Sequence, residues 1–148
     1  MTISRKVLCV TYGLISVVAL VVTWANLVPL VRRVGFWGAQ WQFWHEDVLM
    51  NESSRFLIID VLFFALAVVI WMVLEARRLG IPGVWLYVAV AVLIGVSVAF
   101  PVYMIHRERR LAAREPNTAA GTLKALDGVG ILLFGVAFTA FGVITLSR

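Results

Sequence analysis

The chain has 148 residues, of which 62% are hydrophobic and 14% are charged, and its mean hydropathy is +0.97. Soluble domains are about 45–50% apolar, so this composition excludes an ordinary soluble enzyme and predicts a single membrane domain over residues 1–148. The net charge of +5 is typical of basic residues at lipid headgroups. No basic stripe is interleaved with aromatic residues, which argues against nucleic acid as a partner.

Four apolar runs determine the expected fold, because a membrane-spanning helix needs about 20 mostly apolar residues. We expect helices over residues 7–31, 56–76, 84–105 and 128–146, which together predict an all-α, integral membrane four-helix bundle. Charged residues are absent from three of these runs, and the stretch from Phe56 to Leu74 carries only Asp60. Gly80, Pro82 and Gly83 in the short connection between the second and third helices predict a tight turn.

An aromatic segment follows the first helix, over residues 32–55. It contains three tryptophans and two phenylalanines, namely Phe36, Trp37, Trp41, Phe43 and Trp44. Tryptophan favours the membrane–water interface, because its ring is apolar and its N–H needs a partner. Two interpretations follow from this composition: an interfacial helix lying on the membrane, or a lid over a lipid-facing pocket.

A basic segment follows the third helix and carries Arg107, Arg109, Arg110, Arg114 and Lys124. We expect it in water or against anionic headgroups, either through general attraction or through recognition of a specific lipid head. With four spans, the two larger connections lie on one side of the membrane and carry more basic residues than the other side. That count favours a cytoplasmic location for them, whereas the basic amino end, with Arg5 and Lys6, favours the opposite orientation.

Small residues recur at helical spacing in the last two expected helices. Gly128, Gly135 and Gly142 lie seven residues apart in the fourth helix, and a seven-residue repeat keeps one face turned toward a neighbour. Ala91, Gly95 and Ala99 form a similar row in the third. Small residues let helices approach closely in lipid, so both rows predict contact faces, either inside the bundle or, for the fourth helix, in a homodimer.

The polar residues of the spans suggest a single site. In a four-span topology one half of the membrane contains Asn26, Asp60, Ser97, Tyr103, His106 and Asp127. A carboxylate within a span is costly, so Asp60 should face other helices and be paired or protonated. It is either structural, hydrogen-bonded to Asn26 or a nearby backbone group, or functional, as a proton carrier, general acid or ligand anchor. The candidate catalytic residues are therefore Asp60, Tyr103 and His106.

Metal and cofactor chemistry find no support in the sequence. His45 and His106 match no helical ligand pair, and no zinc motif, glycine-rich phosphate loop or nucleophile elbow is present. Cys9 is the only cysteine, which excludes an internal disulfide and chemistry that needs paired thiols. We expect no metal and no cofactor.

Several short motifs resemble a family over about residues 6–111. They are Arg5-Lys6, Trp24 with Asn26, Asn51 with Ser53-Ser54, Glu75-Ala76-Arg77-Arg78-Leu79, Trp85 with Tyr87, Phe100-Pro101 and Arg107-Glu108-Arg109. Together they resemble a bacterial domain-of-unknown-function family of small multi-pass membrane proteins. The usual core of that family has three spans, so the fourth helix lies outside it. The resemblance implies no activity.

Three classes of function remain. Small-residue rows and few polar groups favour a non-enzymatic membrane subunit or lipid-binding protein. The alternatives are an integral membrane enzyme that acts on an isoprenoid or other lipid with Asp60 as acid, and a small proton-coupled transporter. The expected partners are membrane lipids and further copies of the chain or a larger membrane complex, and the expected location is the bacterial cytoplasmic membrane.

Overall fold

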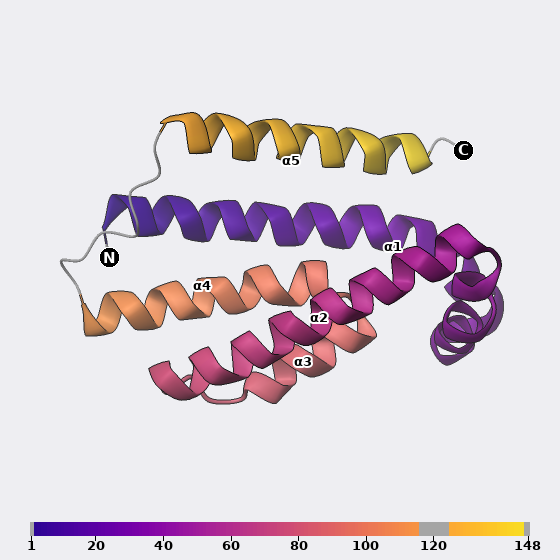
Figure 1. Cartoon of the computed structure of the whole chain (residues 1–148), viewed down its shortest axis with the longest axis horizontal. Helices are drawn as coiled ribbons and strands as arrows, with labels where there is room; N and C mark the ends of the chain where they lie inside the picture. The colour runs from indigo at the N-terminus through magenta and orange to yellow at the C-terminus, as the bar shows by residue number, and fades with distance from the viewer. Residues whose placement is uncertain (1, 116–124, 147–148) are drawn as a thin grey trace.

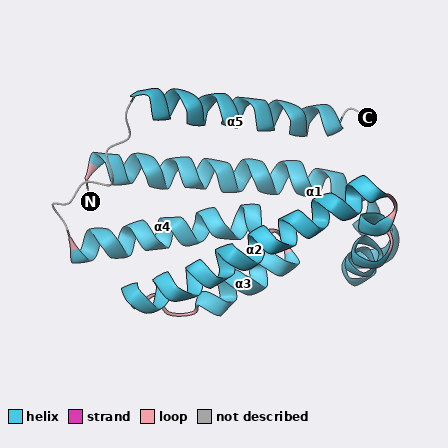
Figure 2. Cartoon of the chain, viewed as in Figure 1, coloured by secondary structure: helices cyan, strands magenta, loops and turns pink. Residues whose placement is uncertain are grey.

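The computed structural model describes residues 2–115 and 125–146, and none of these residues is in a strand (Figure 2). The all-α fold class is therefore confirmed, although these described residues form five α-helices where the sequence predicts four. In order they are α1 (Ile3–His45), the short 3₁₀ helix η1 (Asp47–Leu49), α2 (Glu52–Leu79), α3 (Val84–Leu93), α4 (Val96–Arg114) and α5 (Ala125–Leu146), as Figure 1 shows.

A kink at Gly35 divides α1 into residues 3–34 and 36–45. Gly35 has φ 76° and ψ 168°, a combination that essentially only glycine adopts. A Cβ added there would meet nothing within 4 Å, so backbone conformation rather than space requires glycine at this position. The kink turns the aromatic segment away from the axis of the long first part of α1.

The ends of α2 follow local sequence signals. Asn51 is the N-cap, and its Oδ1 accepts a hydrogen bond of 2.8 Å from the backbone N–H of Ser54, which satisfies one of the free donors of the first turn. Gly80 ends the helix in the left-handed conformation, with φ 62°, as glycine commonly does. These two caps set the ends of α2, which extends a few residues beyond the predicted range of 56–76 on each side.

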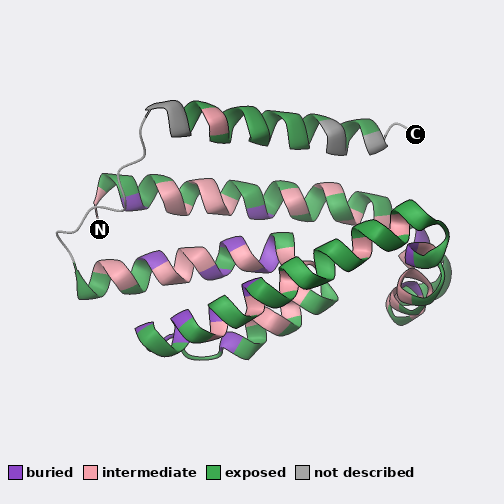
Figure 3. Ribbon diagram, viewed as in Figure 1, coloured by how far each residue is buried: buried purple, intermediate pink, exposed green. Residues whose placement is uncertain are grey.

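Two helices, α1 and α2, are long and apolar enough to cross a membrane. Most of the large apolar side chains on them are exposed, and green, which marks exposed residues, covers much of the ribbon of α1 and α2 in Figure 3. Phe56 is 75% exposed and Phe63 is 70% exposed. Large contiguous apolar surfaces are unusual on soluble monomers, so length, composition and exposure together indicate membrane association.

The single helix predicted over residues 84–105 is wrong. Helix α3 ends at Leu93, Gly95 has φ 147° and ψ 140°, and α4 begins at Val96. The chain reverses there, so that α3 and α4 form an antiparallel hairpin (Figure 1). The Tyr87 hydroxyl lies 2.9 Å from His106 Nδ1, whereas 19 residues of continuous helix would separate the two positions by about 28 Å.

Helix α4 occupies the centre of the fold, because it packs against α1, α2 and α3. The buried cluster between α2, α3 and α4 includes Met72 and Tyr103, which are 1% and 0% exposed. The Tyr103 hydroxyl donates a hydrogen bond of 3.0 Å to the Met72 carbonyl. On the other side of α4, the Ser16 hydroxyl of α1 donates one of 3.1 Å to the Val98 carbonyl.

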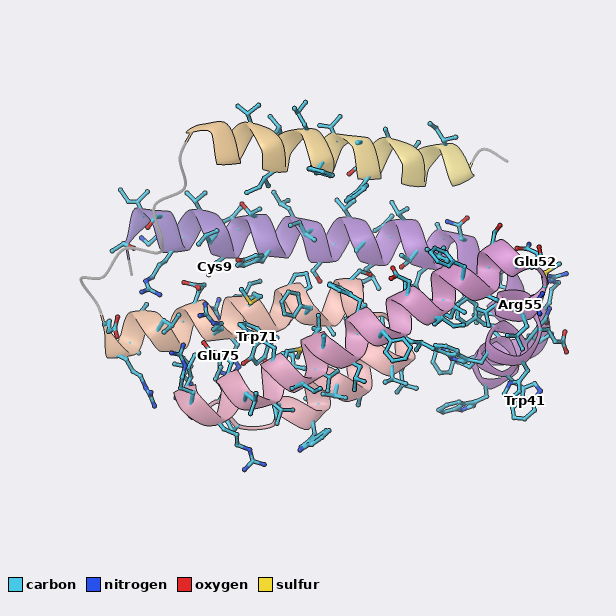
Figure 4. The ribbon with its side chains drawn as sticks, in the orientation of Figure 1. Cys9, Trp41, Glu52, Arg55, Trp71 and Glu75 are labelled. Atoms are coloured by element: carbon cyan, nitrogen blue, oxygen red, sulfur yellow. The ribbon has the colours of Figure 1, made fainter. Side chains whose placement is uncertain are left out.

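An ionic network joins α1, α2 and α4 at the end of the fold where α1 begins. Arg5 pairs with Glu108 at 3.0 Å, and Arg107 bridges Glu108 at 2.9 Å and Glu75 at 2.8 Å. Arg78 also pairs with Glu75, at 2.6 Å. The side chains of Arg5 and Glu108 are only 4% and 5% exposed. Figure 4 shows Glu75 toward this end and Glu52 with Arg55 at the opposite end.

Helix α5 lies along α1, on the side away from α4 (Figure 1). A Cβ added at Gly128 or Gly135 would meet nothing within 4 Å, so these two glycines do not form the predicted contact face inside the bundle. The surroundings of Gly142 lie outside the described residues. The predicted row of Ala91, Gly95 and Ala99 does not exist either, because the chain reverses at Gly95.

We expect Glu108→Gln to lower the free energy of unfolding by about 3–5 kcal/mol, because it removes the buried carboxylate that pairs with both Arg5 and Arg107. Thermal or denaturant melts of the protein in detergent measure this change. Glu46→Gln is the matched control, since Glu46 is exposed and belongs to no ion pair among the described residues. Equal stability of the two variants would contradict a structural role for the network.

Candidate functional site

A pocket of about 820 Å³ lies where the tip of the α3–α4 hairpin meets α1 and α2. Its lining comes from four stretches of chain, within residues 23–33, 40–47, 58–69 and 91–97. Leu27, Leu62, Val69 and Val92 are among the apolar lining residues. A volume of this size falls within the range of about 300–1,000 Å³ found for small-molecule sites.

Two side chains of α1 hold the hairpin tip. Trp24 Nε1 donates a hydrogen bond of 3.2 Å to the Ile94 carbonyl, and Gln40 Nε2 donates one of 3.0 Å to the Leu93 carbonyl. The reversal at Gly95 takes these carbonyls out of the helical ladder, and an apolar environment requires that each find another partner. The first and second parts of α1 therefore each supply one donor to the tip.

The kinked part of α1 forms one wall of the pocket. Gln40, Phe43 and Trp44 line it, and Ala39 is fully buried beside them. Trp37 and Trp41 lie on the outer side, with 73% and 65% of their surface exposed. This short helix thus has one face toward the pocket and one aromatic face toward the surroundings.

Asn26 and Ser97 line the pocket, but Asp60 does not. Asp60 is exposed on α2, and it forms no hydrogen bond or ion pair among the described residues. The Asn26 side chain donates to the Val22 carbonyl of its own helix at 2.8 Å, rather than to Asp60. The expected burial of Asp60 against other helices is therefore absent from the structure.

The other members of the predicted polar cluster do not join Asp60. Tyr103 contacts Met72, which lies 12 residues along α2 from Asp60, or about 18 Å in a helix. His106 contacts Tyr87, farther along the same hairpin. The side chain of Asp127 lies outside the described residues. The predicted cluster assumed one continuous third helix, and the reversal at Gly95 moves Tyr103 and His106 toward the opposite end of the fold.

Sequence reasoning did not identify Arg33, Gln40, Gln42 and Asp47 as site residues, although all four line the pocket. The available signal was Gly35, since a glycine between a long apolar helix and a polar, aromatic segment is compatible with a fold-back. Among the described residues no group of three or more histidine, cysteine or acidic side chains has metal-ligand geometry. The pocket can therefore offer hydrogen bonds, one charge of each sign and apolar contact.

A family described as protein of unknown function DUF2834 matches residues 11–109. Since the match covers well over half of the chain, the chain belongs to this family. The matched region runs from α1 to the charged part of α4, and α5 lies outside it. No curated protein and no solved structure is similar enough to the chain to be matched.

Replacing the side chain that holds Leu93 should weaken the fold. We expect Gln40→Leu to lower stability by about 1–3 kcal/mol, because it leaves the Leu93 carbonyl without its donor. Gln42→Leu makes the same change two residues away, at a side chain that lines the pocket without a hydrogen bond among the described residues. Detergent melts that show the same loss for both variants would refute the assigned role of Gln40.

Proposed function

We propose that this member of the DUF2834 family is a multi-pass, non-enzymatic membrane protein that holds a lipid-like amphiphile in the hairpin-tip pocket. The observation that carries the proposal is the pocket itself: a volume of about 820 Å³ with mainly apolar walls, built from four separate stretches of chain. Sites for small molecules combine such walls with a few polar groups that orient the ligand.

The helix lengths support a membrane location with a re-entrant hairpin. The long helices α1 and α2 suit full crossings of a hydrocarbon core of about 30 Å. Helix α3 has 10 residues, or about 15 Å, which is enough to enter the core but not to cross it. Non-helical backbone at membrane depth is tolerated where protein encloses it or where it lines a cavity, and the Gly95 tip lines the larger pocket.

The lining indicates the chemistry of the ligand. Arg33, Gln40, Gln42 and Asp47 come from the region around the α1 kink, which in this topology lies near one membrane surface. The walls from α2 and the hairpin tip are apolar, with Leu62, Ala65 and Val92 among them. An amphiphile whose polar head meets both Arg33 and Asp47, and whose hydrocarbon chain lies along α2, fits this division. The kinked helix then acts as a lid over it.

The hairpin also changes the expected orientation. At the end where α1 begins lie eight basic residues of the described chain: Arg5, Lys6, Arg77, Arg78, Arg107, Arg109, Arg110 and Arg114. The opposite end has three, namely Arg32, Arg33 and Arg55. The positive-inside rule then favours a cytoplasmic location for the amino terminus. This reverses the orientation that a continuous third helix favours, because the basic part of α4 returns to the side from which α3 entered.

The enzyme and transporter alternatives depend on Asp60 as an acid or proton carrier that faces other helices. An exposed Asp60 outside the pocket, with Tyr103 and His106 toward the other end of the fold, offers no such arrangement. The membrane-subunit or lipid-binding function needs neither a general acid nor a proton path. It is therefore the function that these contacts support best.

Filling the pocket should displace its ligand. We expect Ala65→Phe to reduce the amphiphile that co-purifies with the protein, because Ala65 lines the pocket, and to leave the fold intact. Ala67→Phe, on the exposed side of the same helix, is the matched control and should retain the amphiphile. Mass spectrometry of extracts from the detergent-purified proteins measures the bound species. The proposal would be contradicted if Ala65→Phe retained every bound species, or if both variants lost the amphiphile equally.

A further inference from the structure

A second, smaller hollow lies between α3 and α4, away from the hairpin tip. Its volume is about 380 Å³, and it is lined by Tyr87, Val102, Ile105, His106, Arg109 and Arg110. It shares no residue with the larger pocket. It therefore calls for an explanation of its own.

The hollow follows a single stripe of α4. Its five α4 residues lie along two rows, at positions 102, 105 and 109 and at positions 102, 106 and 110, and steps of three and four residues keep both rows on one face of the helix. Val102 and Ile105, nearer the hairpin tip, are apolar, whereas Arg109 and Arg110, nearer the end of the helix, are basic. The stripe thus changes from apolar to cationic along its length.

The two arginines at the basic end of the stripe differ from the neighbouring arginines, because no carboxylate of the described residues pairs with them. Arg5, Arg78 and Arg107 each have a carboxylate partner. Arg109 and Arg110 are exposed, and within residues 2–115 and 125–146 neither forms an ion pair. Guanidinium groups bind phosphate oxygens through two parallel hydrogen bonds. An external anion is therefore the partner that this end of the stripe lacks.

His106 lies between the apolar and basic parts, and Tyr87 fixes its ring. The Tyr87 hydroxyl lies 2.9 Å from His106 Nδ1, which leaves Nε2 available to the hollow. Burial lowers the pKa of His106, and the positive charges of Arg110 and Arg109 lower it further, which favours the neutral ring. When the Tyr87 hydroxyl donates to Nδ1 of the neutral ring, the ring's own proton is on Nε2, where it can be donated to an acceptor in the hollow.

We propose that this hollow between α3 and α4 binds the phosphate headgroup of an anionic phospholipid, whose hydrocarbon chain lies along Val102 and Ile105. Arg109 and Arg110 bind the phosphate, and the His106 ring donates beside them. A free phosphate ion would use the basic end but not the apolar end. The proposal rests on the membrane location and orientation proposed above, which place the basic end at the anionic cytoplasmic leaflet. It does not depend on what fills the larger pocket.

Lipid retention by the full-length protein tests this assignment. The detergent-purified protein is incubated with dioleoyl phosphatidylglycerol or dioleoyl phosphatidylcholine, and native mass spectrometry reports the lipid that stays bound. We expect preferential retention of phosphatidylglycerol, and an affinity about thirtyfold lower in the Arg109→Gln/Arg110→Gln variant. That factor corresponds to about five- to sixfold for each arginine, because each variant side chain loses its charge-assisted hydrogen bonds to the phosphate.

The matched control is Lys6→Gln/Arg77→Gln, which removes the same charge from exposed positions at the same end of the fold. It should retain phosphatidylglycerol as the unaltered protein does, and so should Ala65→Phe, whose substitution fills only the larger pocket. Equal losses in the two double variants would overturn the proposal in favour of diffuse attraction. Equal retention of the two lipids would also overturn it.

A second arm separates the two sources of phosphate. Inorganic phosphate is titrated into the lipid-free protein by calorimetry. We expect it to bind far more weakly than phosphatidylglycerol, because it makes no contact with the apolar end of the hollow. Phosphate that binds as tightly as the lipid, with the same loss in Arg109→Gln/Arg110→Gln, would identify a free anion as the ligand and overturn the lipid assignment.

Discussion

The backbone of Gly95 is the constraint on which the rest of the fold depends. Its φ of 147° and ψ of 140° belong to a region that is essentially closed to residues with a side chain. A Cβ there would meet only the Ser97 hydroxyl, at the ordinary contact distance of 3.6 Å. The position therefore needs glycine for its conformation and not for space. Because the chain turns back here, α4 runs antiparallel to α1 and lies at the centre of the fold.

The reversal has a cost that α1 offsets. It exposes the carbonyls of Leu93 and Ile94, and each unsatisfied carbonyl in an apolar environment costs several kcal/mol. Gln40 and Trp24 satisfy them, but Gln40 can do so only because Gly35 folds the end of α1 back toward the tip. Gly35 and Gly95, which lie 60 residues apart in the chain, thus both shape one pocket. Gly95 reverses the chain at the hairpin tip, and Gly35 brings Gln40 back to bind that tip.

The same reversal brings charged residues together at the end of the fold where α1 begins. Arg5, Glu75, Arg107 and Glu108 meet there although they come from three helices. Buried ion pairs contribute little net stability, because desolvation offsets most of their attraction, but breaking one is costly. We therefore interpret the network as a device that fixes the register of α1 against α4. A slip by one residue would separate Arg5 from Glu108 and break the buried ion pair that joins α1 to α4.

Local signals made much of this fold predictable. Apolar runs identified α1, α2 and α5, and the glycine-rich connection at residues 80–83 marked the turn before α3. The reversal at Gly95 was not predictable in this way, because glycine within an apolar run is equally compatible with close helix packing. That ambiguity produced the incorrect third helix, and the predicted cluster of Tyr103 and His106 with Asp60 depended on that helix. The heptad glycines of α5 carried the same ambiguity, and Gly128 and Gly135 lie against open space.

The most direct test of the hairpin is a distance between Tyr87 and His106. Spin labels at Tyr87→Cys and His106→Cys, in a Cys9→Ala background, are measured by electron paramagnetic resonance in lipid nanodiscs. The rings of these residues lie 6.2 Å apart in the structure, so the hairpin predicts strong dipolar broadening from closely spaced labels. A narrow distribution near about 28 Å, the rise of 19 residues of uninterrupted helix, would contradict the reversal at Gly95 and the pocket built on it.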